Sequence, residues 1–354
     1  MEIILAVNPG STSTKIGLFS GEECLVKEVI RHPEQDLAGF ASVMDQAPYR
    51  RKVILETLQE NGTDPAGLSA IVVRGGLLRP LEGGVWLVGE EMVADLSACR
   101  YGTHASNLGG VIAYPVGREL KIPVFTVDPV TVDEFEDVAR YSGLKNVRRL
   151  SMSHALNMKA VARKAANALH TVYEELNLVV AHLGSGISVS AHRRGKMVDV
   201  NNANNEGPFS LERSGTLPAL ALIDLCYNSG RTEQEMKELV TSAAGVYSYL
   251  GTKDFQKVTE KVLTKDAAAT AVVGAMAYQV AKEIGAMAAV LHGGVDRVIL
   301  TGGMAYSTPL VEMISEQVRF IAPVELMPGE EELEALAAGA LRVLRGHEEA
   351  KIYK

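Results

Sequence analysis

The sequence predicts an α/β protein built from two related domains. Short apolar runs bounded by Gly, Asn and Pro alternate with longer segments of helical periodicity, a pattern typical of α/β folds. The length of 354 residues suits two domains of about 150 to 180 residues better than one core. A strand, a polar turn and a second strand occur near the beginning and again from Val179. We therefore expect a duplicated domain, with a ligand held between the two hairpin tips.

Strands are expected where a short apolar run is bounded by turn residues. These runs lie at 3–7, 13–19, 70–74, 124–127, 178–182, 187–192 and 295–301. Helices are expected where apolar residues recur with helical spacing over longer segments. These segments lie at 43–61, 107–120, 153–176, 216–227, 232–242, 267–292, 309–320 and 331–346.

No Ser/Gly-rich linker or low-complexity segment separates two halves of the chain. The boundary between the domains is therefore expected inside a structured element. We place the first domain at 1–175, with the first hairpin, and the second at 176–325, with the second hairpin and a Gly-Gly turn. The carboxyl-terminal helix, within 326–354, is expected to pack back on the first domain.

Charge and cysteine usage limit the classes of partner. The formal net charge of −8 argues against a nucleic-acid or anionic-membrane partner, because such sites need clustered Lys and Arg. Cys24, Cys99 and Cys226 fit no metal or redox spacing and are expected to be reduced and buried. The opening residues lack the basic region and long apolar run of a signal peptide, and charges interrupt the apolar stretch 267–291. We expect a cytoplasmic protein.

The first hairpin has a dense turn of small and hydroxyl residues after Asn8, with Gly10, Ser11, Ser13 and Lys15 as its candidate binding residues. Successive backbone N–H groups in such a turn form a concavity that suits phosphate oxygens. A plain hairpin turn is the alternative. The segment by itself does not decide between the two.

Two further glycine turns are candidate nucleotide contacts. Gly184, Ser185 and Gly186 form the second hairpin turn, although Gly-x-Gly most often marks only a tight turn. A later strand ends in Gly302 and Gly303, where a ligand can approach the backbone closely. No Walker-type loop occurs, and the Gly184 turn leads into a strand without a third glycine, so Walker and dinucleotide-binding motifs are excluded.

The order of two phosphate hairpins and a Gly-Gly adenosine turn resembles the superfamily of acetate and sugar kinases, actin and heat-shock chaperone ATPases. The resemblance implies two duplicated ribonuclease-H-like (actin-like ATPase) domains with an interdomain active-site cleft that closes over ATP. Sugar kinases, actin and chaperones usually carry aspartate where this chain has Asn8, whereas acetate and butyrate kinases carry asparagine. An amide can donate a hydrogen bond to phosphoryl oxygens, which a carboxylate would repel.

Five longer segments narrow the resemblance to the butyrate kinases of the acetokinase family. They are VVRGGLLRPLEGG from Val72, THASNLGG from Thr103, TVDPVTVDEF from Thr126, NNANNEGPFSLERSGTLP from Asn201 and PGEEELEALAAGALRVL from Pro328. The resemblance implies a reversible, in-line phosphoryl transfer from ATP to butyrate or a branched short-chain fatty acid, with Mg²⁺, by a homodimer or larger homo-oligomer. The alternatives are an acetate kinase and, in another class, an actin-like or chaperone-like ATP switch.

The resemblance assigns two arginines to catalysis. Arg213, in ERSG, matches the acetate-kinase arginine that contacts the phosphoryl group in flight; a surface salt bridge is the alternative. Arg74 directly precedes two glycines, whereas acetate kinases place their second arginine three residues before His-Gly-Gly. We expect Arg74 to bind the substrate carboxylate or acyl phosphate from this shifted position.

Three carboxylates are candidates for holding Mg²⁺. Asp128, in VDP, corresponds to the family's aspartate near the phosphoryl site; the alternative is a turn or cap residue. Glu331 or Glu332 matches the family's metal-holding glutamate, with an ambiguous register. An acidic helix N-terminus stabilised by the helix dipole would explain the same residues without a metal.

The remaining candidates line the expected phosphoryl and acyl sites. His182 matches the family's histidine before the second turn and can donate to the γ-phosphate; without the resemblance it is a buried, satisfied histidine. His104 and His154 also match family histidines, but a third active-site histidine of acetate kinase is replaced by an apolar residue. Val73 and Thr103 are expected beside the acyl chain, where a side chain smaller than leucine lengthens the pocket.

Overall fold

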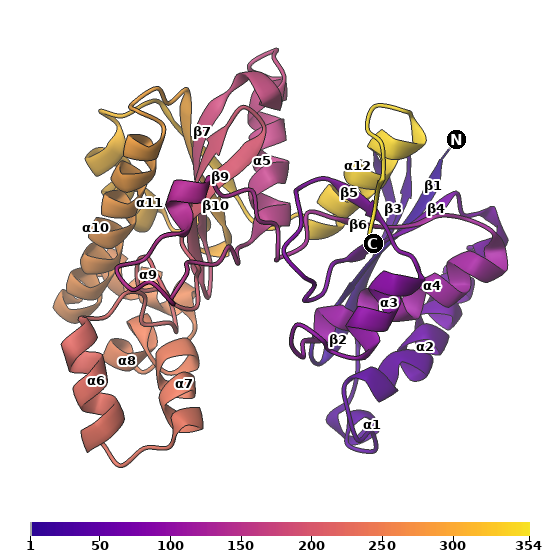
Figure 1. Cartoon of the computed structure of the whole chain (residues 1–354), viewed down its shortest axis with the longest axis horizontal. Helices are drawn as coiled ribbons and strands as arrows, with labels where there is room; N and C mark the ends of the chain where they lie inside the picture. The colour runs from indigo at the N-terminus through magenta and orange to yellow at the C-terminus, as the bar shows by residue number, and fades with distance from the viewer. Residues whose placement is uncertain (1) are drawn as a thin grey trace. The chain divides into compact units, whose positions relative to one another are not determined.

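The computed structural model describes residues 2–354, which form two compact units (Figure 1). Unit 1 runs to Val132 and resumes at Glu331–Lys354, and unit 2 is Asp133–Glu330. This division differs from the sequence-based boundary at 175, because helix α5 (Ala155–Ala168) packs on strands of the second sheet. The carboxyl-terminal helix α12 (Glu332–Leu344) packs on the first sheet and belongs to unit 1.

Unit 1 contains a seven-stranded mixed sheet in the order β12-β5-β6-β4-β1-β2-β3. Its strands are β1 (Ile3–Pro9), β2 (Ser13–Ser20), β3 (Glu23–Arg31), β4 (Ala70–Arg74), β5 (Val85–Leu87), β6 (Val124–Val127) and β12 (Lys351–Ile352). Strands β1, β4 and β6 are parallel, so their carboxyl ends meet at one edge of the sheet. Strands β1 and β2 form the antiparallel first hairpin.

Helices cover both faces of this sheet (Figure 1). The helices of unit 1 are α1 (Glu34–Leu37), α2 (Ala47–Glu60), α3 (Glu90–Ser97), α4 (Leu108–Leu120) and α12, with short 3₁₀ turns at Met44–Gln46, Pro65–Gly67 and Ala105–Asn107. On one face Gly339 of α12 lies against Val127, and on the other Gly109 of α4 lies against Val73. A Cβ atom at either glycine would collide with these side chains, so the glycines permit close packing of helix on sheet.

Unit 2 contains a five-stranded sheet in the order β11-β10-β7-β8-β9. Its strands are β7 (Asn177–Leu183), β8 (Ile187–Arg193), β9 (Lys196–Val200), β10 (Arg297–Gly302) and β11 (Val324–Pro328). Its helices are α5, α6 (Ala219–Asn228), α7 (Glu233–Ser242), α8 (Gly245–Leu250), α9 (Phe255–Leu263), α10 (Ala267–Val290) and α11 (Thr308–Val318), with 3₁₀ turns at Asp137–Arg140, Tyr173–Glu175 and Gly303–Tyr306.

The two sheets share one arrangement, which confirms the expected duplication. In unit 1, β6-β4-β1-β2-β3 has parallel β6–β4 and β4–β1 pairs and antiparallel β1–β2 and β2–β3 pairs. In unit 2, β11-β10-β7-β8-β9 repeats that order and those directions. Each hairpin therefore occupies the same position in its own sheet.

Most segments predicted from the sequence form the expected element, with shifted ends. The helix expected at 153–176 ends at Ala168, and the one expected at 216–227 begins only after Pro218. Strands β3, β5, β9, β11 and β12 and helices α1, α3, α8 and α9 were not expected. The expected burial of the cysteines was wrong, since Cys24 and Cys226 are exposed and Cys99 is half-buried. The apolar stretch 267–291 forms α10, capped by Asp266, whose side chain accepts a hydrogen bond from Ala269 N. No helix within residues 2–354 is long and apolar enough to cross a membrane.

Candidate active site

The first hairpin turn lies at the tip of β1 and β2 in unit 1. Asn8 pairs with Lys15, and the turn is closed by a hydrogen bond from Gly10 N to Ser13 O at 2.7 Å. Ser11 is exposed and Asn8 is buried. The structure therefore places the predicted phosphate-binding residues of this hairpin on one tight, accessible turn.

Glu332 joins two of the predicted catalytic residues at the carboxyl edge of the first sheet. Its Oε1 lies 2.7 Å from Nη1 of Arg74, and its Oε2 accepts a hydrogen bond from Asn8 Nδ2 at 2.5 Å. Glu332 is the first residue of α12, whereas Glu331 precedes the helix and is exposed. Of the two candidate glutamates, Glu332 is therefore the one that contacts Arg74 and Asn8.

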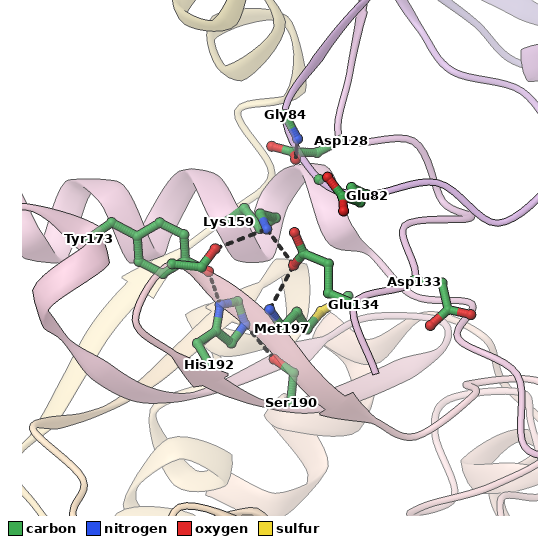
Figure 2. A network of polar contacts seen from close by, with 12 residues as sticks. Glu82, Gly84, Asp128, Asp133, Glu134, Lys159, Tyr173, Ser190, His192 and Met197 are labelled. Atoms are coloured by element: carbon green, nitrogen blue, oxygen red, sulfur yellow. Dashed lines mark hydrogen bonds and ion pairs between the residues drawn. The ribbon is translucent and has the colours of Figure 1, made fainter. Parts of the chain in front are cut away.

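Asp128 follows β6 and lies buried beneath a glycine loop (Figure 2). Its Oδ1 accepts a hydrogen bond from Gly84 N at 2.7 Å, and its own N–H donates to Gly84 O at 3.0 Å. Its φ of 39° lies in the left-handed region, which few non-glycine residues adopt. A residue held in such a conformation by reciprocal hydrogen bonds is fixed in position, as a functional carboxylate must be.

The candidate acyl-pocket residues of unit 1 have different surroundings. Val73 is buried in the hydrophobic core of the unit, against α4. Thr103 is exposed in the loop before the 3₁₀ turn Ala105–Asn107. His104 caps that turn by accepting a hydrogen bond from Ser106 N at 3.2 Å, and partial burial together with the nearby charge of Arg74 lowers its pKa. Only Thr103 and His104 therefore present side chains outside the core.

In unit 2 the second hairpin turn lies beside the Gly-Gly turn. Strands β7 and β10 are parallel with His182 opposite Thr301, so Gly302 follows directly alongside the end of β7. Gly302 has φ 89°, and a Cβ atom there would collide with the backbone of Leu183. Two glycine motifs about 120 residues apart in the sequence are thus adjacent at the carboxyl ends of neighbouring strands, where α/β proteins bind ligands.

His182 is the centre of a buried polar cluster next to this turn. Its Nδ1 lies 2.8 Å from Asn157 Oδ1, and its Nε2 lies 3.1 Å from Glu330 Oε1. Its ring stacks on His154, with centroids 3.9 Å apart and planes 10° from parallel. Because Asn157 donates through Nδ2 to Gly329 O, its Oδ1 faces the histidine and accepts from Nδ1–H. The Nε2 atom is therefore the one directed to Glu330.

Arg213 lies against the backbone of the second turn. A Cβ atom at Gly186 would collide with its guanidinium group, so any larger residue there would displace the guanidinium. The loop that carries Arg213 is tied to the same turn because Ser210 donates from Oγ to Ser185 O and accepts from Arg213 N. No carboxylate among residues 2–354 lies within ion-pair distance of Arg213, and Glu212 instead pairs with Lys253 at 2.8 Å. A half-buried guanidinium without an acidic partner suits an incoming anion.

Helix α5, which carries Asn157, is fixed by a buried network (Figure 2). Lys159 is 2% exposed and pairs with Glu134 at 2.7 Å, and it also donates to Gly195 O at 3.2 Å. Glu134 in turn accepts a hydrogen bond from Met197 N at 2.7 Å. The network holds α5 to the β8–β9 turn, and it thereby sets the position of the residues that contact His182.

Residues 138–325 match the Acetokinase family, and they make up more than half of the chain. The chain belongs to the acetokinase family. The protein is therefore a carboxylate kinase, a phosphotransferase with a carboxyl group as acceptor.

Solved structures of two acetate kinases and a propionate kinase share the fold of nearly the whole chain. Acetate kinase from Porphyromonas gingivalis matches with a TM-score of 0.78 at 20% identity, over 97% of this chain and 100% of its own. Acetate kinase from Entamoeba histolytica matches with a TM-score of 0.76 at 16% identity, over 97% and 99%. A propionate kinase from Francisella tularensis matches with a TM-score of 0.73 at 18% identity, over 96% and 99%. At these identities the likeness shows the fold, and it confirms the duplicated actin-like ATPase architecture.

The carboxylates of this acetokinase-family chain fit Mg²⁺ as a donor set. Within residues 2–354 no three His, Cys, Asp or Glu side chains are grouped as a complete metal site. Kinases usually hold Mg²⁺ with one or two carboxylates while phosphates and waters complete the shell, so a complete protein site is not required. Asp128 and Glu332 are oxygen donors, each held by hydrogen bonds or an ion pair within unit 1.

Sequence reasoning missed three residues that contact the predicted site of this family member. They are Asn157 and Glu330, which contact His182, and Arg50, which contacts the first turn. His154 is the N-cap of α5 and Asn157 follows it by three residues, so a helix predicted to begin near His154 brings the two close together. Glu330 stands in the acidic run whose register the sequence left open, and nothing in the sequence distinguishes Arg50 from neighbouring Arg51.

Proposed function

We propose that this acetokinase transfers a phosphoryl group reversibly between ATP and butyrate or a branched short-chain relative. The observation that supports the transfer most strongly is the guanidinium of Arg213, which lies against the second glycine turn without an acidic partner. The choice of acid is supported by the segments from Val72, Thr103 and Asn201, which resemble butyrate kinases. From the same resemblance we propose a cytoplasmic homodimer or larger homo-oligomer.

The proposed reaction needs no strong general base. A short-chain carboxylate is ionised at neutral pH, so its oxygen can attack the γ-phosphorus in line. The new bond joins this oxygen to phosphorus, and the bond from phosphorus to the β,γ-bridging oxygen breaks as ADP leaves. Catalysis then consists of positioning and charge neutralisation. In the reverse direction ADP takes the phosphoryl group from the acyl phosphate and ATP forms.

In unit 2, Arg213 is proposed to neutralise the equatorial oxygens of the phosphoryl group in flight. The backbone of Gly184, Ser185 and Gly186 is proposed to hold phosphate oxygens, and Gly302 and Gly303 to let the adenosine approach the backbone. His182, held through Nδ1 by Asn157, presents Nε2 at the edge of the second turn, beside Gly184.

In unit 1, the turn with Gly10 and Ser11 is proposed to hold ATP phosphates. Arg74, oriented by Glu332, is proposed to bind the substrate carboxylate or the acyl phosphate. Asp128 and Glu332 would hold Mg²⁺, which when bound neutralises phosphate charge. Asn8 can donate from its amide either to Glu332, as it does in this structure, or to a phosphoryl oxygen.

The test of this function is acyl-phosphate formation, trapped with hydroxylamine as the hydroxamate. Purified protein and MgATP are supplied with acids from acetate to valerate, including the branched isomers. We expect kcat/KM to peak at four or five carbons, and Thr103→Leu to shift the preference toward acetate. A peak at acetate would make the protein an acetate kinase, in line with the acetate kinases that share its fold.

An ATP switch of the actin or chaperone class is the alternative from a different class. It predicts no hydroxamate with any acid, together with nucleotide-dependent pelleting or partner binding. Asn8 argues against it, because those proteins usually carry aspartate at this position of the hairpin.

A further inference from the structure

Arg50 of α2 is fully buried behind the first hairpin turn, with 0% of its surface exposed. Its Nη1 donates to Gly10 O at 2.7 Å and to Ser13 O at 3.3 Å, and its Nη2 donates to Ser11 O at 2.7 Å. Its Nε and Nη2 also donate to Gln46 Oε1, at 3.1 and 2.7 Å. One guanidinium group thus holds three carbonyl oxygens of the turn.

The fourth carbonyl of the turn, that of Thr12, is also hydrogen-bonded within the protein. Thr12 O accepts a hydrogen bond from His32 N at 2.9 Å, and Ser13 O additionally accepts from Gly10 N. In a planar trans peptide the C=O and the following N–H point in opposite directions. Because the carbonyls of Gly10 and Ser11 are directed at Arg50, the N–H groups of Ser11 and Thr12 are directed away from it. The turn therefore presents donors on the side where Ser11 and Thr12 are exposed.

The charge of Arg50 is not balanced by an acidic side chain. Within the described chain, 2–354, its partners are neutral oxygens, and no carboxylate lies within ion-pair distance. The neighbouring His32 is neutral at pH 7, because burial and the charge of Arg50 lower its pKa to about 4. Burial lowers the pKa of Arg50 as well, but an arginine keeps its proton in proteins. A buried, unbalanced cation is costly unless an anion offsets it.

We propose that Arg50 is a positioning residue for nucleotide binding that acts through the turn. It directs the N–H groups of the turn toward the ATP phosphates, and it supplies a positive charge that those phosphates balance from the other side. Arg50 itself does not touch the nucleotide. This inference rests on the proposed function, in which the first turn holds ATP phosphates.

The deciding variant is Gln46→Glu, which changes charge with almost no change in shape. The new carboxylate accepts the same two hydrogen bonds from Arg50 and forms an ion pair with it, so the turn keeps its support while the net charge behind it falls to zero. We expect the Kd of MgADP and the KM of ATP to rise about 10-fold or more, whereas the melting temperature of the free protein stays unchanged or rises.

The matched control is Gln59→Glu, the same substitution at an exposed position of α2, the helix whose N-cap is Gln46. We expect Gln59→Glu to leave the Kd of MgADP within about twofold of wild type. A purely structural role for Arg50 predicts that Gln46→Glu also leaves the Kd unchanged, and that result would overturn the proposal.

A second pair of variants separates charge from geometry. Arg50→Lys keeps the positive charge but loses the forked guanidinium group that donates to several carbonyls. Arg50→Met loses the charge and the guanidinium group. We expect nucleotide affinity to fall in the order wild type, Arg50→Lys, Arg50→Met; equal affinity in all three would contradict the proposal. If Arg50→Met does not fold, Gln46→Glu still tests the proposal. Failure of the wild-type protein to bind MgADP would refute the proposed function. If the wild-type protein binds MgADP and Gln46→Glu binds it with the same Kd, only the role of Arg50 is refuted.

Discussion

Oε1 of Glu332 lies 2.7 Å from Nη1 of Arg74, where α12 begins beside the carboxyl end of β4. The ion pair is largely shielded, since the side chains of Arg74 and Glu332 are 27% and 12% exposed. Of the three consecutive glutamates 330–332, Glu332 also accepts a hydrogen bond from the side-chain amide of Asn8. The ion pair thus orients Arg74, the residue proposed to bind the substrate carboxylate.

Replacing Glu332 with Gln should lower kcat/KM about 10- to 100-fold, because Arg74 loses the carboxylate that orients it and the proposed Mg²⁺ site loses a donor. The matched control is Glu331→Gln, one residue earlier and exposed. Steady-state kinetics with both substrates varied should show Glu331→Gln within about twofold of wild type. Equal losses in the two variants would contradict the assigned register.

Replacing Arg213 with Ala should reduce kcat by about 10³-fold or more, the effect of removing an arginine that stabilises a phosphoryl transition state. The free protein should keep its stability, since the side chain has no acidic partner to lose. Gly186→Ala offers a graded comparison, because the added Cβ displaces the same guanidinium. Single-turnover assays measure the rate and thermal melts measure the stability. A kcat loss below about tenfold in Arg213→Ala would show that Arg213 does not stabilise the transition state.

Asn157→Leu should change which ring nitrogen of His182 carries the proton, because Oδ1 no longer accepts from Nδ1–H. We expect about 10- to 100-fold loss of kcat, by analogy with other residues that orient a functional histidine. Nitrogen chemical shifts of His182 in NMR spectra measure the tautomer directly. Thr301→Val is the control, since it removes a longer 3.3 Å hydrogen bond to the same amide and leaves Nδ1–H paired. An unchanged tautomer in Asn157→Leu would refute the assignment.

Acid should destabilise the protein through His32. Burial and the charge of Arg50 lower its pKa from 6.5 to about 4 in the folded state, so the unfolded chain takes up a proton first as pH falls. Stability is therefore lost between pH 6.5 and about 4, by about 3 kcal/mol in total. Urea unfolding at several pH values should show a shallower loss for His32→Gln than for wild type. Parallel pH dependence in the two proteins would refute this origin.

The features that the sequence predicted well are local ones. Both hairpins were predicted because small residues in a turn between two apolar runs determine a hairpin without help from distant segments. Helix α10 was predicted from its length and apolar character. The short strands β5 and β12 were missed because each is stabilised by pairing with a distant segment.

The site residues that sequence reasoning missed are those whose role depends on tertiary contacts. Arg50 lies 40 residues from the Gly10 carbonyl that it holds, and Asn157 lies 25 residues from His182. Which glutamate of 330–332 faces Arg74 depends on where α12 begins, and helix ends are the least certain feature of a sequence-based prediction. Val73, a candidate acyl-pocket residue, is buried in the core together with the other apolar residues of β4, whose two faces are both covered.

The most direct test of phosphoryl transfer to a short-chain carboxylate is ³¹P NMR of the protein with MgATP and butyrate. The account predicts that ADP and an acyl-phosphate resonance appear in equal amounts, and that both disappear when Arg213→Ala replaces the wild-type protein. Formation of ADP with inorganic phosphate alone, at a rate that butyrate does not change, would contradict it.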